Sequence, residues 1–357
     1  MKWLIILLAV LSLSTCSEEE PEYVPAPTII AIDTPQFGID SLLALDTSQP
    51  FNGVILVERD GHQLFYRSYG DADREYHLAL HTDAQFMIGS LSKQFTAAIV
   101  LREHERGTLS IYDPIGKHLP EIRQPWKDSV RVYHLLSHTH GIRGLNSPLA
   151  FRQGSQFAYS NFGYGLLEKV LEHATGKTFS QLSTEFFHDI GLTRTSHPEA
   201  STAYPILSYT EQKRDSLVPV RKHIGFPVAA GGFISTASDL ALWNTLLHSG
   251  KVLHDSTYHM MIGHYALRKH PVFGQQDYGY GISSGRDSIA SIGHSGFALG
   301  NASINYYFPK SRTSLIVLEN IAYGPSLREV YGHHKRLFDL VAHKLQSTSS
   351  DGAITMR

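Results

Sequence analysis

The chain has 357 residues, of which 42% are apolar and 18% are charged, and its 29 glycines and 16 prolines are spread along the sequence. This balance is typical of a globular protein with a sizeable core, and it excludes disordered, fibrous and collagen-like chains. Lys plus Arg (31) nearly equals Asp plus Glu (33), so the chain lacks the basic surplus that attracts proteins to phosphates, and we expect no nucleic-acid partner.

The first sixteen residues have the pattern of an export signal. A positively charged start precedes an apolar run from 3 to 13, which is too short to span a bilayer of about 30 Å. Small residues and then Cys16, the only cysteine, follow this run. The segment 13–16 resembles the lipobox of bacterial lipoproteins, which implies that 1–16 is a signal peptide and that Cys16 is lipidated. The alternative is an ordinary signal peptide with an incidental cysteine.

A charged, proline-containing stretch follows the cysteine. We expect 17–35 to form an extended tether, 36–346 to form the folded domain and 347–357 to form a C-terminal tail. A lipidated cysteine before a tether implies attachment to a membrane through the lipid. The expected location is therefore the bacterial cell envelope, on the periplasmic side or exposed at the surface, and secretion is the alternative.

The folded domain is predicted to open with a hairpin and a helix. Two β-type runs between 51 and 69 flank the turn pair 60–61. A helical pattern then runs from 91 to 106 and stops at Gly107. Ser90 is therefore expected at the N-terminus of this helix.

The middle of the chain, about 110–225, contains short helical patterns separated by Gly and Pro, and we predict a mostly helical insertion. The patterns cover 132–138, 163–176 and 179–191. A later turn leads into a helix whose N-cap is expected at Thr236 or Ser238.

The last third of the chain is predicted to be rich in strands. The segments with this pattern are 278–284, 302–308 and 313–319, and an amphipathic helix follows at 327–345. We expect the hairpin and the late strands to share one antiparallel sheet, flanked by helices and interrupted by the helical insertion. This is an α+β fold.

Ser90 and Lys93 form a candidate nucleophile and base. Residues at i and i+3 of a helix are neighbours, about 5–6 Å apart at Cβ. A buried lysine can lose its proton near neutral pH and then accept the proton of a serine hydroxyl. The helix N-terminus adds a backbone N–H that could stabilise an oxyanion. Because this spacing also arises by chance, the pair alone is weak evidence.

Two further motifs follow in the order that a known family shows. The segment FMIGSLSKQFTAA contains Ser90 and Lys93, Tyr159 to Asn161 is the only YxN string, and His294 starts an HxG string. Together they resemble the motifs SxxK, YxN and HxG of the serine β-lactamase and penicillin-binding-protein superfamily. The segments VYHLLSHTHGI and AAGGFISTASDLALW also resemble structural landmarks of that family, so the resemblance covers roughly residues 50–320.

Two other HxG strings exist, at His223 and at His248. His248 is predicted to end a helix, and His223 precedes a glycine turn, whereas His294 leads toward the C-terminal strands. We therefore take His294, with Ser295, Gly296 and the following Phe297, as the third motif.

The resemblance implies a β-lactamase/transpeptidase-like fold and a division of labour among these residues. Ser90 would attack the acyl carbon, and Lys93 and Tyr159 would share the base and acid roles. Asn161 would orient Lys93 and the substrate amide. The backbone N–H groups of Ser90 and Phe297 would hold the oxyanion. Structural alternatives remain open, namely N-caps for Ser90 and Asn161 and a core aromatic for Tyr159.

His294 stands where relatives that bind β-lactams well carry lysine, and it would polarise Tyr159 or meet a substrate carboxylate. The alternative is a structural loop residue. A neutral imidazole anchors a carboxylate less well than an ammonium group, so the HxG motif, with Ser295 and Gly296, argues against an efficient β-lactamase. It favours an esterase or a D-amino-acid peptidase.

We therefore expect a serine hydrolase that acts through an acyl-enzyme on small esters or D-amino-acid-containing peptides, with peptidoglycan fragments as candidates. The alternative is a catalytically weak lipoprotein that binds penicillin or cell-wall peptides. The chain has 21 histidines but no HExxH string, so we expect no metal and no cofactor.

Overall fold

The computed structural model describes residues 37–354 apart from 46–47, 202–204, 214–215, 222–224 and 287–288, with side chains up to residue 347. The predicted signal peptide, Cys16, the whole predicted tether and His223 lie outside the described residues. Within the described part of the chain, no helix is long and apolar enough to cross a membrane.

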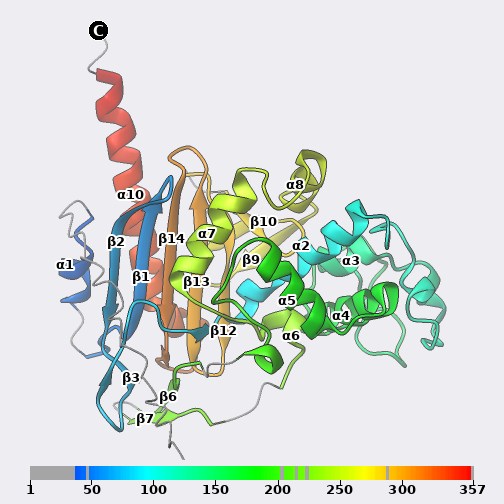
Figure 1. Ribbon diagram of the computed structural model, residues 1–357, viewed down its shortest axis with the longest axis horizontal. Coiled ribbons are helices and arrows are strands. Elements are labelled where there is room, and N and C mark those ends of the chain that lie inside the picture. The colour runs from blue at the N-terminus through cyan, green and yellow to red at the C-terminus, as the bar shows by residue number, and fades with distance from the viewer. Residues whose placement is uncertain are drawn as a thin grey trace, which may run out of the picture. The chain divides into compact units, whose positions relative to one another are not determined.

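An eight-stranded antiparallel sheet forms the centre of the fold, in the order β2-β1-β14-β13-β12-β11-β10-β9 (Figure 1). Its strands are β1 (Gly53–Arg59), β2 (His62–Tyr69), β9 (Ala266–His270), β10 (Gly274–Tyr278), β11 (Ser283–Gly285), β12 (Ile292–Ala298), β13 (Asn301–Phe308) and β14 (Thr313–Glu319). Gly53 of β1 lies opposite Glu319 of β14. The early hairpin and the late strands therefore share one sheet, which confirms the predicted α+β fold.

Smaller sheets of two or three strands lie beside the central one. They pair β3 (Asp71–Asp73) with β4 (Leu78–Ala79), β5 (Phe86–Met87) with β8 (Ile234–Ser235), and β6 (Tyr209–Lys213) with both β7 (Ser216–Pro219) and β15 (Ile321–Ala322). The pair β5 and β8 fixes the chain just before Ser90 against the segment that precedes α7.

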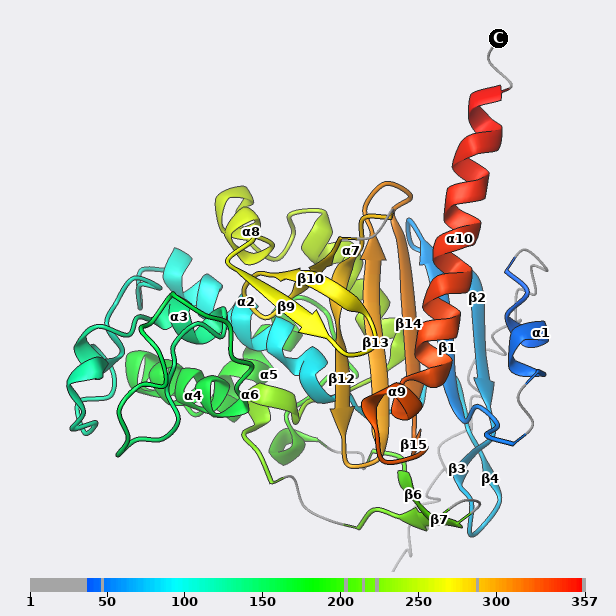
Figure 2. The ribbon, with the colours of Figure 1, turned by 180° about the vertical axis from the view of Figure 1, so that it is seen from behind.

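Helices cover both faces of the central sheet. Helix α7 (Ala237–His248) packs on β1 and β14 on the face seen in Figure 1, and α10 (Gly332–Ile354) packs on the opposite face (Figure 2). The other α-helices are α1 (Ile39–Leu43), α2 (Ser92–Glu105), α3 (Val132–Leu136), α4 (Asn161–Thr175), α5 (Phe179–Asp189), α6 (Val228–Gly231), α8 (Asp255–Met261) and α9 (Leu327–Val330). Short 3-10 helices span Gly89–Leu91, Ile115–Lys117, Pro125–Asp128 and Pro198–Ala200.

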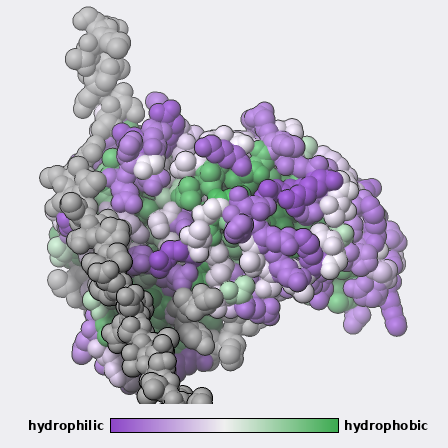
Figure 3. All heavy atoms as spheres, viewed as in Figure 1, coloured by the Kyte–Doolittle hydropathy of each residue, from purple (hydrophilic) through white to green (hydrophobic). Residues whose placement is uncertain are grey.

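Both faces of the strand β1 are buried. Val54 and Leu56 pack into the core that the sheet shares with α2, α4 and α7, whereas Ile55 and Val57 pack toward α10. Because successive side chains of a strand point to opposite faces, a strand covered on both sides must be apolar throughout, as 53–57 is. Figure 3 shows hydrophilic side chains over much of the helical end on the right of that view.

The structure corrects two predicted elements. The segment 278–284 is not one strand, because β10 ends within it and β11 begins within it. Gly281 forms the turn between them, with a φ of 68°, and a methyl group there would lie 2.4 Å from the carbonyl oxygen of Lys93. The predicted helix 327–345 is divided into α9 and α10 after Val330, and Gly332, a poor helix former, lies at the break.

Strands β6, β7 and β9 were not expected from the sequence. The hairpin of β6 and β7 falls inside the region that was predicted to be mostly helical, although α3, α4 and α5 lie where the helical patterns are. Thr236 is confirmed as the N-cap of α7, since its side chain accepts a hydrogen bond from the backbone N–H of Asp239. His248 ends that helix, as predicted.

Candidate active site

Ser90 lies in a 3-10 turn, Gly89–Leu91, that leads into α2. The adjacent strand β12 approaches this turn closely. A methyl group at Gly296 would lie 2.2 Å from the carbonyl oxygen of Ile88 and 3.0 Å from the backbone nitrogen of Ser90. A methyl group at Gly89 would lie 2.5 Å from the backbone nitrogen of Phe297. Glycine at both positions is therefore what allows β12 to lie against the Ser90 turn.

Lys93 lies one helical turn after Ser90 and is fully buried. Its Nζ donates to Ser90 Oγ at 3.1 Å, to Asn161 Oδ1 at 2.9 Å and to the carbonyl oxygen of Ala230 at 2.5 Å. Burial lowers the pKa of Lys93 from its ordinary value, and the Arg268 guanidinium acts in the same direction, against the opposing effect of Tyr159. Three acceptors thus hold the Lys93 amine in place, while burial and the charge of Arg268 favour the release of its proton.

Asn161 is the first residue of α4, and the N-cap of this helix is Ser160, whose hydroxyl accepts from the backbone N–H of Gly163. The alternative interpretation of Asn161 as the N-cap is therefore wrong. Its side chain instead accepts the hydrogen bond from Lys93.

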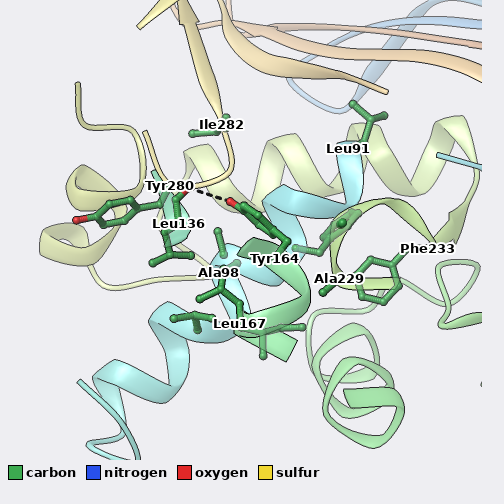
Figure 4. Packing of buried hydrophobic residues seen from close by; sticks show 14 of the residues in the cluster. Leu91, Ala98, Leu136, Tyr164, Leu167, Ala229, Phe233, Tyr280 and Ile282 are labelled. Atoms are coloured by element: carbon green, nitrogen blue, oxygen red, sulfur yellow. Dashed lines mark hydrogen bonds between the residues drawn. The ribbon is translucent and has the colours of Figure 1, made fainter. Parts of the chain in front are cut away.

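Helix α4 is fixed next to α3 by the buried Tyr164. The Tyr164 hydroxyl donates to the carbonyl oxygen of Leu136 at 3.0 Å, and the ring lies among apolar side chains that include Ala98 of α2 (Figure 4). This packing sets the position of the α4 N-terminus, and with it that of Asn161.

Tyr159 lies just before α4, and its side chain is 38% exposed. Lys93 Nζ is 4.8 Å from its ring centroid, and hydrogen-bonding interactions of the hydroxyl with Lys93 and Ser90 contribute to its pKa. Desolvation acts to raise the pKa of the Tyr159 hydroxyl, but the positive charges of Lys93 and Arg268, together with these hydrogen bonds, lower it below its ordinary value. The pKa values of Lys93 and Tyr159 are therefore both lowered toward neutral pH. Burial of a cation lowers that of Lys93, whereas nearby positive charges lower that of Tyr159.

His294 lies on β12 and is fully buried. Its Nδ1 lies 2.6 Å from the carbonyl oxygen of Ser295, and its Nε2 lies 3.1 Å from the Tyr278 hydroxyl and 3.2 Å from Arg268 Nη1. Burial first, and then the charges of Arg268 and Lys93, keep the pKa of His294 well below its ordinary value. A neutral ring that donates from Nδ1 and accepts at Nε2 fits these contacts.

The other two motif residues are placed differently. Ser295 is buried, with its Oγ 3.2 Å from His270 Nε2, whereas the Phe297 side chain is 40% exposed. The structure thus brings Ser90, Lys93 and Asn161 into hydrogen-bond contact, with the Tyr159 ring beside Lys93 Nζ. His294 contacts Arg268 and Tyr278, and its ring centroid lies 6.2 Å from that of Tyr159.

Arg268 is a residue of the site that the sequence analysis missed. It lies on β9, with its guanidinium carbon 4.9 Å from the ring centroid of Tyr159 and 5.8 Å from that of Tyr278. Among the residues that the structure describes, no carboxylate lies within ion-pair distance of it. The only signal in the sequence is weak, namely a short run, YALRKH, ahead of a Pro- and Gly-containing turn.

Across the described ranges, no group of three or more His, Cys, Asp or Glu side chains is arranged to hold a metal ion. The chemistry that the site offers is that of a hydroxyl nucleophile with a buried amine and a phenol as proton acceptors.

Comparisons with known proteins show which proteins this chain is similar to. The chain is 22% identical over 299 residues to "Putative penicillin-binding protein PbpX" of Bacillus subtilis, which covers 78% of this chain and 73% of PbpX. It is 29% identical over 192 residues to "Esterase EstB" of Burkholderia gladioli, covering 42% of this chain and about half (49%) of EstB. The D-amino acid amidase of Ochrobactrum anthropi SV3 has the same fold, with a TM-score of 0.74 to 0.75, 20–21% identity and coverage of 88% of this chain and 98% of the amidase.

The family model described as "Beta-lactamase" matches residues 44–338, which include all three motifs and Arg268. This match extends beyond both ends of the region that the sequence motifs covered. The chain belongs to the Beta-lactamase family.

Proposed function

We propose that the protein is a serine hydrolase that forms an acyl-enzyme on Ser90 and then transfers the acyl group to water. The observation that carries the proposal is the contact of Lys93 Nζ with both Ser90 Oγ and Asn161 Oδ1 in a fully buried position. Such a geometry places a proton acceptor within hydrogen-bond reach of the nucleophile. Relatives named as esterase and D-amino acid amidase support the reaction class.

In the acylation step, Ser90 Oγ attacks the carbonyl carbon of the substrate, and its proton passes to the Lys93 and Tyr159 pair. The carbonyl oxygen becomes an oxyanion, for which the backbone N–H groups of Ser90 and Phe297 are the proposed donors. The C–O or C–N bond to the leaving group then breaks, and Tyr159 returns the proton to the departing oxygen or nitrogen. A water molecule then attacks the acyl carbon and gives a proton to the same pair. The ester bond to Ser90 Oγ breaks, Ser90 regains its proton, and the carboxylic acid is released.

The position of Arg268 supports a substrate whose leaving group carries a carboxylate. Its guanidinium carbon lies 4.9 Å from the ring centroid of Tyr159, the residue that is proposed to return the proton to the leaving group. A guanidinium binds a carboxylate through two parallel hydrogen bonds. His294, which is buried and neutral, is a poorer candidate for this contact. We therefore favour a D-amino-acid-containing peptide over a simple ester.

A kinetic comparison tests this proposal. Hydrolysis of p-nitrophenyl esters and of peptides that end in D-amino acids is measured for the wild type, Ser90→Ala and Ser249→Ala, an exposed serine at the end of α7 that serves as the control. We expect turnover to disappear in Ser90→Ala alone. Turnover that survives in Ser90→Ala would contradict the proposal, and a folded wild type that binds penicillin without any turnover would favour the alternative binding function.

The carboxylate preference has its own test. Each peptide is paired with its C-terminal amide, which has the same size but lacks the charge. We expect the ratio of kcat/KM between acid and amide to fall at least tenfold in Arg268→Met, since a charge-assisted bidentate pair contributes about 1.5–3 kcal/mol. An unchanged ratio would assign Arg268 no part in substrate selection.

Attachment to the cell envelope is a separate proposal that rests on Cys16 and the residues before it. We expect Cys16→Ala to move the protein from the membrane fraction to the soluble fraction of expressing cells. Equal membrane association of wild type and variant would overturn the lipid anchor, and secretion would then be the favoured location.

A further inference from the structure

The residue His138 shows a combination of features that its place outside the three motifs does not explain. It follows α3, it is fully buried, and its φ is 57°. Residues other than glycine rarely adopt this left-handed conformation, although His, Asn and Asp do so more often than the rest. Such backbone geometry persists only where surrounding contacts enforce it, and it concentrates at functional sites.

His138 accepts hydrogen bonds from the backbone on both sides of Tyr159, one through its carbonyl oxygen and one through its side chain. The carbonyl oxygen of His138 accepts from the backbone N–H of Ala158 at 2.9 Å. Its Nδ1 accepts from the backbone N–H of Ser160 at 3.2 Å. One residue therefore binds both chain neighbours of Tyr159.

The imidazole ring of His138 also contacts the Tyr159 ring directly. The two ring centroids are 4.4 Å apart with an interplanar angle of 40°. The rings of Tyr164 and Tyr278 lie 5.1 Å from that of His138 on other sides. The phenol ring of Tyr159 thus has His138 as one of its supports, with Lys93 and Arg268 as cations near the same ring.

The protonation state of His138 is fixed by its surroundings. Because Nδ1 accepts a hydrogen bond, the proton of the neutral ring is on Nε2, which has no hydrogen-bond partner among the described residues. Burial lowers the pKa of His138 well below its ordinary value, and the positive charges of Lys93 and Arg268 act in the same direction. The ring is therefore neutral and remains an acceptor for Ser160.

We propose that His138 is a positioning residue for Tyr159, holding the backbone on both sides of it so that the phenol meets Lys93 and Ser90. This inference rests on the proposed function, since it assigns to His138 an effect on catalysis that acts through Tyr159. Misplacement of a reacting group by about 1 Å can cost about 10²-fold in rate. The contact with Ser160 is thus sufficient to affect turnover without any contact with substrate.

Two substitutions separate the hydrogen bond from the unusual backbone. His138→Gly accepts a positive φ without strain but has no side-chain acceptor. His138→Asn also tolerates this conformation, and its Oδ1 lies at a position equivalent to Nδ1, where it can accept from Ser160. The matched control is His134→Asn, because His134 is a buried histidine of the same segment that contacts Arg131 and Tyr133 rather than Tyr159.

The test is steady-state hydrolysis of a p-nitrophenyl ester, with thermal unfolding as the check on folding. We expect kcat to fall about 10- to 100-fold in His138→Gly with KM changed less than about threefold, because positioning affects the reacting groups more than binding. His138→Asn should recover kcat to within about threefold of the wild type, and His134→Asn should leave kcat unchanged. A folded His138→Gly variant with wild-type kcat would overturn the inference.

A double-mutant cycle identifies the route of the effect. If His138 acts through the Tyr159 hydroxyl, adding His138→Gly to Tyr159→Phe should lower kcat by less than about threefold further. Full additivity would contradict the inference. Should His138→Gly fail to fold, His138→Asn decides: a folded Asn variant that loses more than about tenfold in kcat, while it can still bind Ser160, refutes the proposed contact. A wild type without any turnover would instead overturn the proposed function, and this inference with it.

Discussion

Lys93 Nζ lies 2.9 Å from Asn161 Oδ1, although the two residues are 68 positions apart and lie at the N-terminal ends of two different helices. Lys93 belongs to α2, which follows the early hairpin, and Asn161 begins α4 in the middle of the chain. Their contact joins the first motif to the second. It orients the buried amine toward Ser90, so the proposed chemistry depends on it.

Substituting Asn161 by alanine should therefore lower kcat. The change leaves one donor of a buried amine without its acceptor, which costs about 1–3 kcal/mol and corresponds to about 10- to 100-fold in rate if the cost falls on the transition state. Initial rates of ester hydrolysis measure this. Asn161→Asp is the informative partner variant, since its carboxylate favours charged Lys93 and should move the rise of activity with pH to higher pH. Wild-type rates in Asn161→Ala would show that Lys93 needs no orientation.

Removing the charge of Arg268 should shift the pH profile of kcat/KM. Arg268 lowers the pKa of Tyr159 and also that of Lys93. In Arg268→Met both values should move upward, toward their ordinary range, so whichever group is the base will deprotonate at higher pH. We expect the rising limb of the profile to move to higher pH. An ester without a carboxylate serves as substrate, which keeps any effect on substrate binding apart, and a limb that stays in place or moves to lower pH contradicts this account.

Gly296→Ala should block acylation while the protein still folds. The added methyl group would lie 2.2 Å from the carbonyl oxygen of Ile88, so β12 must move away from the Ser90 turn. We expect labelling of Ser90 by a fluorophosphonate to slow at least about tenfold, since small displacements of reacting groups have large rate effects. The control is Gly332→Ala, because no atom lies within 4 Å of a methyl group at that position. Equal labelling rates in the two variants would contradict the close approach of β12.

Stability should fall as the pH decreases below about 6.5, the ordinary pKa of histidine. Burial lowers the pKa of His248 and His334 to about 3 and that of His140 to about 4. With folded-state values below the unfolded one, the unfolded chain takes up protons first, so the stability present above pH 6.5 is lost as the pH falls toward these values.

The substitution His248→Phe tests the part of this loss of stability that is due to His248. The His248 ring stacks on the Tyr307 ring, with the two ring centroids 4.1 Å apart. A phenyl ring can keep this contact but cannot bind a proton. The hydrogen bond between His248 Nδ1 and the Tyr258 hydroxyl is lost, so some stability should be lost at neutral pH. The decrease in the free energy of unfolding between pH 7 and pH 5 should nevertheless be smaller, by up to about 2 kcal/mol. Chemical denaturation at both pH values measures it, and an unchanged decrease contradicts the assignment.

Much of the fold was predictable because it depends on local patterns. The hairpin before Tyr69, the helix after Ser90 and the strands β13 and β14 each show their own periodicity and their own end signals. The division of 278–284 was missed because a glycine turn and a strand interior can share the same apolar pattern. Gly281 turns there to approach Lys93, which is a contact that only the folded chain defines.

The residues of the candidate site also differ in how far the sequence could predict them. Ser90 and Lys93 are one helical turn apart, so elementary helix geometry connects them, whereas Tyr159 and His294 could be assigned only through the family resemblance. Arg268 was not predicted because β9 is a short, charged edge strand that pairs with the next strand, β10. Its position beside Tyr159, which comes far earlier in the chain, is defined only in the folded protein. The left-handed backbone of His138 leaves no trace in the sequence either.

The most direct test of the central claim is the mass of the intact protein after exposure to a fluorophosphonate probe, for the wild type, Ser90→Ala and Lys93→Ala. We expect one adduct per wild-type chain, located at Ser90, with no adduct in Ser90→Ala and strongly slowed labelling in Lys93→Ala. A folded wild type that forms no adduct, or an adduct that persists in Ser90→Ala, would contradict the assignment of Ser90 as the nucleophile.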